Sequence, residues 1–521
     1  MRVILFLLYF PSFSIAANIL FLENFASPSH HLWIRTLLVA LAQKGHNVTS
    51  ISANRETEIV PNLHYVHMDS VYDVMFNKSN EDHWQDIDFM TWKTWNPFRQ
   101  YFVFMSLCDQ MITGELKSSG YKELLSYSNK TTFDLIIHDY IAGPALLSFV
   151  EKFSNPPLIA ATAFYGTAFT SGFTGSILTP SFVPYSFAHI DLSSFWGRLT
   201  NHLLIWLDYF IREYYIVPKI NHAVKKDFPM GSDVRDIEKR TKLILLNKHP
   251  SIDITEPLMS NVIPVGGLQI QRASNLSKDI QELLDQATDG VILFSLGTKA
   301  QSALLGQDYI TEILEVFRSL HTYTILWKFE AETLTLPLPS NVVIKKWFPQ
   351  RDVLAHPNLK LFITHCGILS IQEAAWYGVP ILGLPVFADQ TLNILISVKA
   401  GVAEQGDIFN IERNSLRALI EKLLYNPKYR ANAQIQSKIF RDQKETPLER
   451  AVWWTEFVLR HPNMTFMRSP SLDLNFAVRH SWDILAFIFT IIFLFILISL
   501  KILCLFFRKY FKKLLKKDKL D

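Results

Sequence analysis

The sequence predicts an α/β protein with two doubly wound domains that face each other across a cleft. Short apolar stretches of strand length alternate with helix-length segments through both halves of the chain, which is typical of mainly parallel sheets. Hydrophobic residues make up 49% of the 521 residues, which allows a large core and excludes a disordered chain. The three cysteines, Cys108, Cys366 and Cys504, are too few for a disulfide framework and lack the spacing of a zinc site. Packing of apolar side chains must therefore hold the fold together.

The two ends of the chain have the composition of targeting segments. Residues 1–17 combine one Arg, an apolar run and small residues, which predicts a cleaved secretory signal peptide. Residues 482–507 contain an apolar run from Ile484 to Phe507, interrupted only by Lys501, that would rise about 36 Å as a helix and span a bilayer. The basic residues that follow place the tail, 508–521, in the cytosol. Residues 18–481 are then expected in the lumen or outside the cell.

The net charge and two kinds of short motif indicate where the protein is located and which partners it is expected to bind. The formal net charge is +3, but the tail alone carries +5, so the remainder is at −2 and nucleic acid is not an expected partner. Lys517 and Lys519, fifth and third from the end, resemble the dilysine signal that retrieves membrane proteins to the endoplasmic reticulum. Five N-x-S/T sequons predict a glycoprotein, although Asn47 opens an apparent core strand and is expected to stay unmodified. The sequons are at Asn47, Asn77, Asn129, Asn275 and Asn463.

The N-terminal domain is predicted over residues 18–261. It begins with the strand Ile19–Leu22 and a helix from His30 to Lys44, which Gly45 is suited to end. Its further predicted elements are the strands Val48–Ile51, Phe133–Asp139 and Leu158–Thr162 and a helix around Pro144–Phe153.

The C-terminal domain is predicted over residues 262–460, with a linker over 461–481. Neither half contains the glycine patterns of a standard dinucleotide site or of a P-loop. The predicted strands are Val291–Leu296, Thr324–Phe329, Val342–Lys346, Leu359–Thr364 and Ile381–Leu384, and the predicted helices are Tyr309–Leu320, Ser370–Tyr377 and Gln390–Ala400.

The segment from Trp347 to Gln390 carries the candidate chemistry. The strand Leu359–Thr364 brings His365, Cys366 and Gly367 to the turn before a helix. Parallel sheets bind ligands beyond the carboxyl ends of their strands, and a helix N-terminus offers free amides to a phosphate. Gly367 allows close approach of the backbone, and His365 can donate a further hydrogen bond. This turn is therefore a predicted phosphate site.

Neighbouring side chains suit the other parts of a nucleotide and a sugar. Trp347 offers a ring face to a flat base, and Gln350 an amide to the base or the ribose. Glu373 could accept hydrogen bonds from ribose hydroxyls, and Asp389 with Gln390 could hold sugar hydroxyls. Each residue alone is more often structural, but together and in this order they indicate a binding site.

The same segment closely resembles the signature of the UDP-glycosyltransferase family. W-x-P-Q, T-H-x-G, the Glu on the next helix and F-A-D-Q all stand in order. The resemblance extends to Ser29-His30, to K-G-H at Lys44–His46 and to F-S-L-G-T at Phe294–Thr298. It implies the GT-B fold, in which the N-terminal domain holds the acceptor and the C-terminal domain holds the UDP-sugar. The signal peptide, single span and basic tail resemble the membrane-bound animal branch.

Several positions distinguish this chain within the family. The opening Ser27–Trp33 and the pair Leu369-Ser370 look like those of invertebrate or insect members. Cys366 stands where the family usually has Gly, and Leu369 replaces the Asn of many vertebrate members.

The resemblance also implies roles for individual residues. His30, 16 residues before His46, would be the general base and Asp139 the carboxylate that orients it, with His31 a rival by proximity. Displacement at the anomeric carbon would invert an α-linked donor to a β-glycoside. No cofactor or metal is expected, since the UDP-sugar is a co-substrate and helix amides with His365 would stabilise the leaving UDP. The implied UDP-sugar-binding residues are Ser295, Thr298, Trp347, Gln350, His365, Gly367, Ser370, Glu373, Asp389 and Gln390.

The acceptor and the donor sugar are only partly indicated. The aromatic stretches Tyr72–Phe104 and Phe164–Phe187 suit core packing, bilayer contact or the lining of a pocket for a small lipophilic acceptor. UDP-glucose is the favoured donor, because Val386–Asn393 lacks the basic residue that a glucuronic acid carboxylate requires, although Lys299 could supply one. The alternatives are a UDP-glucuronosyltransferase and, in a different class, a non-catalytic lipophile-binding membrane protein. A single span excludes a polytopic transporter, and a homo-oligomer is left open.

Overall fold

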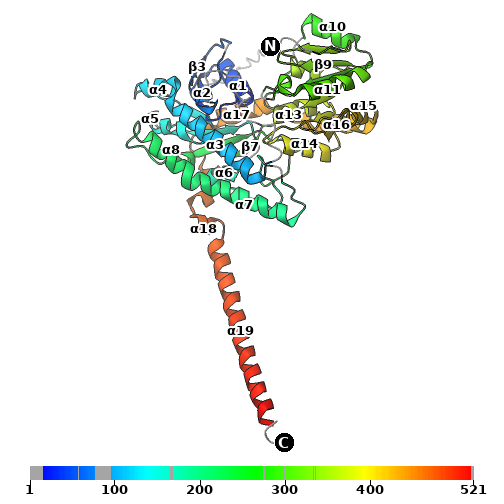
Figure 1. The fold of residues 1–521 in the computed structure, drawn as a ribbon. Coiled ribbons are helices and arrows are strands. Elements are labelled where there is room, and N and C mark those ends of the chain that lie inside the picture. The colour runs from blue at the N-terminus through cyan, green and yellow to red at the C-terminus, as the bar shows by residue number, and fades with distance from the viewer. Residues whose placement is uncertain are drawn as a thin grey trace, which may run out of the picture. The chain divides into compact units, whose positions relative to one another are not determined.

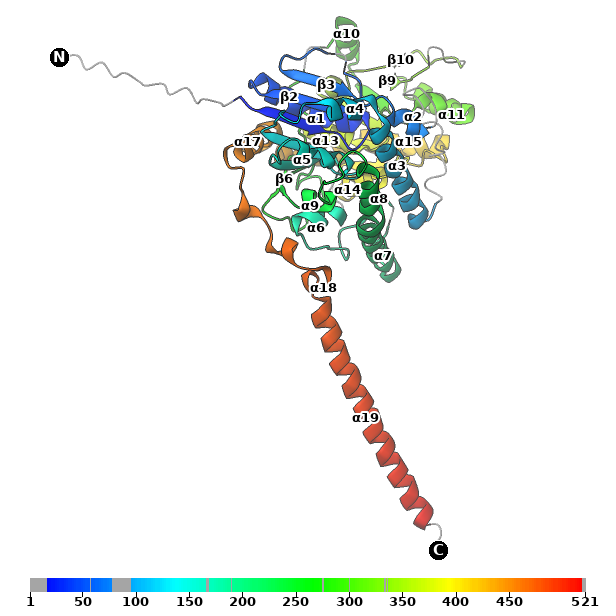
Figure 2. The same ribbon diagram turned by 90° about the vertical axis from the view of Figure 1, so that its left-hand side faces the viewer.

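The protein is described by a computed structural model that divides into two units, Met1–Met467 and Arg468–Asp521 (Figures 1 and 2). It describes residues 16–56, 58–76, 95–164, 168–188, 190–273, 276–298, 300–331, 334 and 336–517. The signal peptide predicted over residues 1–17 lies almost entirely outside these residues, and so do Asn77, Asn275 and Lys299.

The first half of the larger unit is built on a seven-stranded sheet in which every described pairing is parallel. The strand order is β3-β2-β1-β4-β5-β6-β7, so the chain moves outward from β1 in both directions. The strands are β1 (Asn18–Leu22), β2 (Asn47–Ser52), β3 (Leu63–His67), β4 (Leu135–Asp139), β5 (Leu158–Thr162), β6 (Thr241–Leu246) and β7 (Val262–Pro264).

Alternation along the central strand separates two cores in this half. Ile19 and Phe21 pack with α1 (Pro28–Gln43) and α17 (Pro447–Arg460) on one face. Leu20 and Leu22 pack with α3 (Pro97–Lys117) and α8 (Val217–Val224) on the other. Its helices are α1 (Pro28–Gln43), α2 (Val71–Phe76), α3 (Pro97–Lys117), α4 (Ser119–Ser126), η3 (Ala145–Ser148), α5 (Phe149–Lys152), α6 (Ala168–Thr174), α7 (Phe195–Ile211), the π-helix η4 (Arg212–Ile216), α8 (Val217–Val224) and α9 (Val234–Glu238).

The second half contains a six-stranded parallel sheet with the order β10-β9-β8-β11-β12-β13. GT-B architecture requires two such sheets, and the expectation of two doubly wound halves is confirmed. The strands are β8 (Val291–Ser295), β9 (Thr324–Lys328), β10 (Val342–Lys345), β11 (Leu359–Thr364), β12 (Ile381–Gly383) and β13 (Ala403–Gln405). The helices are α10 (Lys278–Gln286), η5 (Ser302–Leu304), α11 (Gln307–Ser319), α12 (Gln350–Leu354), α13 (Ile368–Tyr377), α14 (Gln390–Lys399), α15 (Arg413–Tyr425), α16 (Pro427–Arg441), α17 (Pro447–Arg460) and η6 (Thr465–Met467).

The last long helix of the larger unit, α17, returns to the first half. Its Ala451, Val452 and Val458 are buried in the core that contains α1, and Glu456 forms an ion pair of 2.7 Å with Lys44 at the end of α1. A Thr446–Glu449 capping box begins the helix. The domain boundaries at 261/262 and 460/461 stay predictions, while the structure pairs β7 with β6 and packs α17 against α1.

Helix α7 places an acidic side chain in the core. Asp208 is fully buried, and neither of its carboxyl oxygens has a hydrogen-bond partner among the described residues. Burial raises the pKa of Asp208 to about 8, although the charge of Arg212 acts in the opposite direction. The folded protein therefore holds a proton on this carboxyl that the unfolded chain releases near pH 4.

This proton predicts a stability that falls with increasing pH. Between pH 4 and 8 the folded state binds more protons at Asp208 than the unfolded state does, so the free energy of unfolding decreases as pH rises. Asp208→Asn should lose this dependence. Thermal unfolding midpoints of the full chain in detergent, measured at pH 5, 6.5 and 8, should fall less steeply in the variant. Parallel curves for the two proteins would contradict the prediction.

The smaller unit contains η7 (Pro470–Asp473), α18 (Phe476–Arg479) and α19 (Trp482–Lys517). The segment Trp482–Lys512 of α19 is long and apolar enough to cross a membrane, as the sequence predicted for residues 482–507. The helix extends beyond Phe507 into the basic tail.

Candidate active site

The predicted site residues come from the central strands of both sheets. Each sheet reverses its strand order there, between β1 and β4 in the first half and between β8 and β11 in the second. Ligands of open parallel sheets bind at such switch points, beyond the carboxyl ends of the strands. His30 follows β1 and Asp139 ends β4, while Ser295 ends β8 and His365 follows β11. Residues far apart in the sequence are thus brought to the facing edges of the two sheets.

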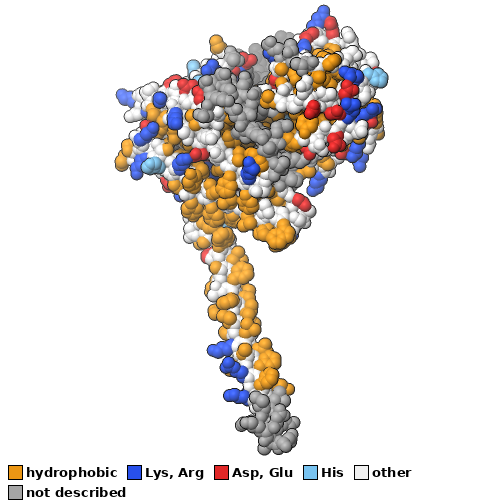
Figure 3. All heavy atoms as spheres, in the orientation of Figure 1, with side chains coloured by type: hydrophobic (Ala, Val, Ile, Leu, Met, Phe, Trp, Pro, Cys, Tyr) orange, Lys and Arg blue, Asp and Glu red, His pale blue; other side chains and the backbone are white. Residues whose placement is uncertain are grey.

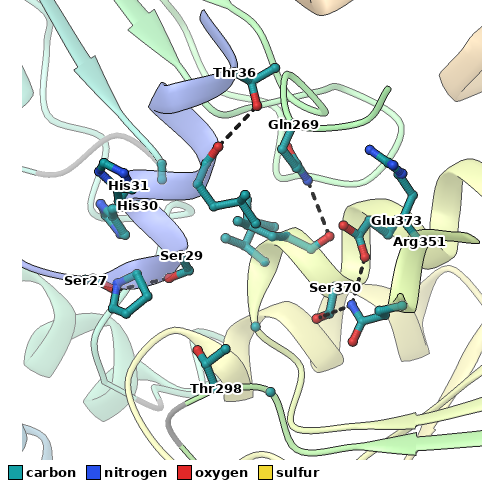
Figure 4. Close-up of a pocket in the computed structure, with 18 of the residues that line it drawn as sticks. Ser27, Ser29, His30, His31, Thr36, Gln269, Thr298, Arg351, Ser370 and Glu373 are labelled. Carbon is teal, nitrogen blue, oxygen red and sulfur yellow. Dashed lines mark hydrogen bonds between the residues drawn. The ribbon is translucent and has the colours of Figure 1, made fainter. Parts of the chain in front are cut away.

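A cavity of about 1460 Å³ lies between the two halves. Every predicted site residue except Asp139 lines it. Figure 4 shows His30 and His31 on α1 at one side and Ser370 and Glu373 on α13 at the other. The cavity is lined by elements of both halves, and its volume is large enough to hold a nucleotide sugar and a second small molecule.

His30 and Asp139 form a buried pair. The Nδ1 atom of His30 lies 3.3 Å from Oδ2 of Asp139, and both side chains are buried. The rings of Phe25 and Phe164, at 4.6 and 4.3 Å between centroids, enclose the imidazole. Burial raises the pKa of Asp139, while the hydrogen bond and charge of His30 oppose the shift. With Nδ1 directed at the carboxylate, Nε2 is the nitrogen left to take a proton from a ligand.

His31 belongs to a different network. Its Nδ1 lies 3.4 Å from Glu23, and its Nε2 lies 3.6 Å from Glu56, which also binds Arg35. Burial would lower the pKa of His31, but the hydrogen bonds and charges of Glu23 and Glu56 outweigh it and raise the pKa. Both ring nitrogens of His31 face carboxylates of the protein, so neither is left to take a proton from a ligand.

Two glycines pack closely against the ring of His365: Gly297 after β8 and Gly367 after β11. A Cβ atom at Gly297 would lie 2.4 Å from the imidazole, and one at Gly367 would lie 2.7 Å from its Nε2. Gly297 also has φ +84°, which favours glycine. Burial and, to a smaller extent, the charge of Lys328 together lower the pKa of His365 to about 4, so the ring is neutral near pH 7. A neutral His365 can donate one hydrogen bond beside the free amides at the start of α13.

Gln350, Ser370 and Glu373 form one hydrogen-bonded group. The Nε2 atom of Gln350 donates to Oε2 of Glu373 at 2.8 Å and to Oγ of Ser370 at 3.1 Å. Burial raises the pKa of Glu373 to about 7, against the effects of Gln350 and Arg351. One oxygen of Glu373 therefore holds Gln350, and the other stays available at the cavity wall.

Lys328 is a cavity residue that the sequence analysis did not identify. It ends β9 and donates from Nζ to the carbonyl of Gly297 and to Glu330, both at 2.8 Å. Its Nζ is 5.9 Å from the ring centroid of Trp347, which is 62% exposed. Its position at the end of β9, beside the switch-point strand β8, is the feature that could have identified Lys328 from the sequence. Ser295 accepts from the Gly297 amide, and Thr298 lines the cavity beside them.

Asp389 precedes α14, and its carboxylate is held by a side chain of that helix. Asn393 donates from Nδ2 to Oδ2 of Asp389 at 2.8 Å and to the Cys366 carbonyl at 2.9 Å. Burial raises the pKa of Asp389 to about 6, against the hydrogen bond of Asn393 and the charge of His30, which lines the same cavity. Gln390 uses its carbonyl oxygen to accept from the amides of Val386 and Phe387. Asn393 therefore links the turn at Cys366 to the carboxylate of Asp389, a role that the sequence analysis did not assign to it.

Cys366 has an unusual backbone for its residue type. Its φ is +71°, and its buried Sγ occupies the space against Gly383. A non-glycine residue in this conformation costs about 1–2 kcal/mol. Burial also raises the pKa of the thiol well above its usual value, so Cys366 is not activated as a nucleophile.

Cys366→Gly should be tolerated. Glycine removes the backbone strain but leaves a small void where Sγ was, so we expect stability within about 1 kcal/mol of the parent protein and near-normal or slightly raised transfer. Cys366→Val is the control, because a β-branched residue is poorly suited to this φ and should be less stable. Thermal unfolding and turnover measure both effects. Complete inactivity of the glycine variant would reveal a function of the thiol.

The two aromatic stretches contribute to the core and to the cavity. Tyr101, Phe173, Tyr185 and Phe187 are buried in the first core. Tyr72, Phe104 and Phe164 line the cavity. Residues 77–94 of the first stretch, which include the sequence's one Asp-x-Asp pair, lie outside the described residues. Among the described residues, no group of three or more His, Cys, Asp or Glu side chains is placed to hold a metal.

The fold and the facing switch points define a class, the GT-B glycosyltransferases. A solved structure of the calicheamicin glycosyltransferase CalG4 is similar in fold, with a TM-score of 0.55 and 17% identity over 86% of this chain and 99% of that one. The model of the UDP-glucoronosyl and UDP-glucosyl transferase family matches residues 21–517, so the chain belongs to this family of UDP-sugar transferases.

Curated relatives agree with this assignment. The UDP-glycosyltransferase UGT5 of Dactylopius coccus is 31% identical over 95% of this chain and 94% of its own length. The UDP-glucuronosyltransferase 2B33 of Macaca mulatta is 28% identical over 95% of this chain and 94% of its own length. The suspected family is thus confirmed, and a non-catalytic protein is not supported.

Proposed function

We propose that this protein transfers glucose from UDP-glucose to a hydroxyl of a small lipophilic acceptor, with inversion at the anomeric carbon. The observation that carries the proposal is that His30, held from behind by Asp139, lines one shared cavity with His365 and Asp389. Sugar and acceptor would meet between them.

The geometry supports His30 as the general base. Asp139 accepts from Nδ1–H and stabilises the positive charge as Nε2 takes the acceptor's proton. The acceptor oxygen then bonds to the anomeric carbon as the bond from that carbon to the UDP oxygen breaks. The free amides of α13 and the neutral His365 would stabilise the departing diphosphate. No metal is needed for this step.

The cavity wall supports a lipophilic acceptor. On the side of the first half it is formed by Phe25, Phe104, Leu107, Met111 and Phe164 around His30. Such walls bind apolar molecules and exclude water from the reacting hydroxyl.

The carboxylate assigned to the sugar end supports glucose over glucuronic acid. The cations that line the cavity are Lys328, Arg35, Arg55, Arg272 and Arg351. Lys328 lies against Gly297 and Trp347, at the phosphate and base end, and is paired with Glu330. Asp389, at the sugar end, would repel a sugar carboxylate whenever it is ionised. Lys299 could supply a cation but lies outside the described residues.

The experiment compares the two donors with one acceptor. Microsomes that express the full chain are supplied with a phenol and with UDP-glucose or UDP-glucuronic acid in parallel. We expect higher kcat/KM with UDP-glucose and a β-linked product by NMR. A higher kcat/KM with UDP-glucuronic acid would instead support the alternative function.

We further propose that the protein resides in the endoplasmic reticulum membrane as a single-pass protein with its catalytic halves in the lumen. The leader-like residues 1–17, the apolar α19 and the Lys517/Lys519 tail support this topology. Protection of the larger unit from protease in sealed microsomes tests it, and digestion of that unit without detergent would contradict it.

A further inference from the structure

Helix α7 buries Leu204, Ile205 and Tyr209 together with two polar side chains, and it also exposes several large apolar side chains. Asn201 and Asp208 point into the core and are fully buried. The outward positions Phe195, Trp196 and Leu203 are exposed instead, Trp196 at 73% and Leu203 at 52%. Surface helices normally expose polar residues opposite their buried stripe, so a second, exposed apolar face marks a contact surface for a membrane or another protein.

The exposed side chains form a continuous face. Phe195, Trp196, Leu199 and Leu203 fall within about 100° of one another around the helix axis. A row of stacked rings continues the face through Phe210 to Tyr214, with 6.0 Å between those two centroids. We define the outer face of α7 as the exposed residues Phe195, Trp196, Leu199 and Leu203 of α7 together with Tyr214 and Tyr215 of η4, which directly continues it. Figure 3 shows hydrophobic side chains gathered at the lower edge of the larger unit, where Figure 1 labels α7.

We propose that the outer face of α7 lies in the headgroup region of the bilayer that α19 enters, as a second membrane contact of the chain. Trp and Tyr are the residues enriched at the membrane–water interface, because their rings are apolar and their edges can hydrogen-bond. The defined face contains no charged residue, so the contact depends on apolar burial rather than on anionic lipids.

The short connection between the larger unit and α19 favours the bilayer as the partner of the outer face of α7. Only residues 468–481, 14 in number, separate the larger unit from the start of α19. Fully extended, they span at most about 50 Å. This tether keeps the bilayer at a high effective concentration around the outer face, whereas another protein would have to bind from solution.

The contact would serve the proposed reaction. Helix α7 packs against α3, whose Phe104, Leu107 and Met111 line the acceptor side of the cavity. The outer face would therefore hold that side of the cavity near the bilayer, where lipophilic acceptors concentrate. This consequence rests on the proposed function, but the membrane contact itself does not.

A depth measurement on the full chain tests the contact. Leu199→Cys, in a Cys504→Ser background, is labelled with bimane and reconstituted in phosphatidylcholine vesicles; the other two cysteines are buried. Ile439→Cys on α16, 56% exposed in the parent, is the control. We expect brominated lipid to quench the probe at 199 and aqueous iodide to quench the probe at 439. Iodide quenching at 199 would overturn the proposal, and protection from both quenchers would show a protein partner, such as a second copy, instead.

A second measurement uses a protease site inserted within residues 468–481. After cleavage of the reconstituted protein, we expect the larger fragment to sediment with the vesicles. Polar substitutions on the outer face should lower its vesicle partition coefficient by at least about 100-fold, because each buried apolar side chain contributes about tenfold. Release of the parent fragment, or equal retention of the outer-face variant, would overturn the proposal. UDP-sugar transfer before cleavage confirms that each variant is folded. The outer-face variant is Trp196→Ser, Leu199→Gln, Leu203→Gln and Tyr214→Ser, and its control is Ile435→Gln with Ile439→Gln.

Discussion

Replacing His30 by alanine is expected to lower turnover by at least about 100-fold, the usual minimum for loss of a general base. The acceptor hydroxyl would then have to lose its proton to water, and the phenyl rings of Phe25 and Phe164 restrict water at this point. The affinity for UDP should be unchanged, because the candidate donor residues belong to the other half. Turnover and UDP binding of the full chain measure the two effects separately.

His31→Gln is the matched control for His30→Ala. His31 is held between Glu23 and Glu56, and its replacement removes the imidazole that faces these two buried carboxylates. We therefore expect a lower unfolding temperature with turnover much closer to the parent. Near-normal turnover in His30→Ala together with inactive, folded His31→Gln would move the base to His31.

His365→Ala and Asp389→Ala should separate two parts of donor recognition. His365 lies at the start of α13, and loss of a hydrogen bond to a charged phosphate should weaken UDP by about 10-fold or more. Asp389 is assigned to the sugar, so its removal should lower transfer by about 10- to 100-fold with little change in UDP affinity.

The measurement for this pair is UDP affinity by calorimetry beside kcat/KM for transfer. Asp389→Asn is a useful companion, because it keeps the size of the side chain while removing the charge beside Asn393. If His365→Ala and Asp389→Ala lose equal UDP affinity, the assignment of the sugar to Asp389 is wrong.

The sequence predicted the strands next to the site well for a physical reason. β1, β5 and β11 are short apolar runs that are buried on both sides, and each is followed at once by a turn or helix signal. Residues fixed by a local pattern, such as His365 and Gly367 after β11, could therefore be placed from the sequence.

Other features depend on contacts between distant segments and were not predictable. Lys328 reads as the end of an ordinary strand until Gly297 and Trp347 are folded beside it. The role of Asn393 requires the turn at Cys366, 27 residues earlier. The exposed apolar face of α7 was also missed, because the sequence of a helix with apolar residues on two faces does not show that Trp196 faces outward while Leu204 faces the core.

The return of α17 to α1 has a consequence for protein engineering. The half that carries His30 is discontinuous in sequence, since its cores include Val262 of β7 and Ala451, Val452 and Val458 of α17. Glu456 of α17 also binds both Lys44 and His46 of the K-G-H motif. A chimera that exchanged only residues 18–261 between two relatives would place a foreign α1 against the resident α17. Crossover points for hybrid enzymes should therefore keep β7 and residues 447–460 with the acceptor half, so that exchange of acceptor specificity preserves these native contacts.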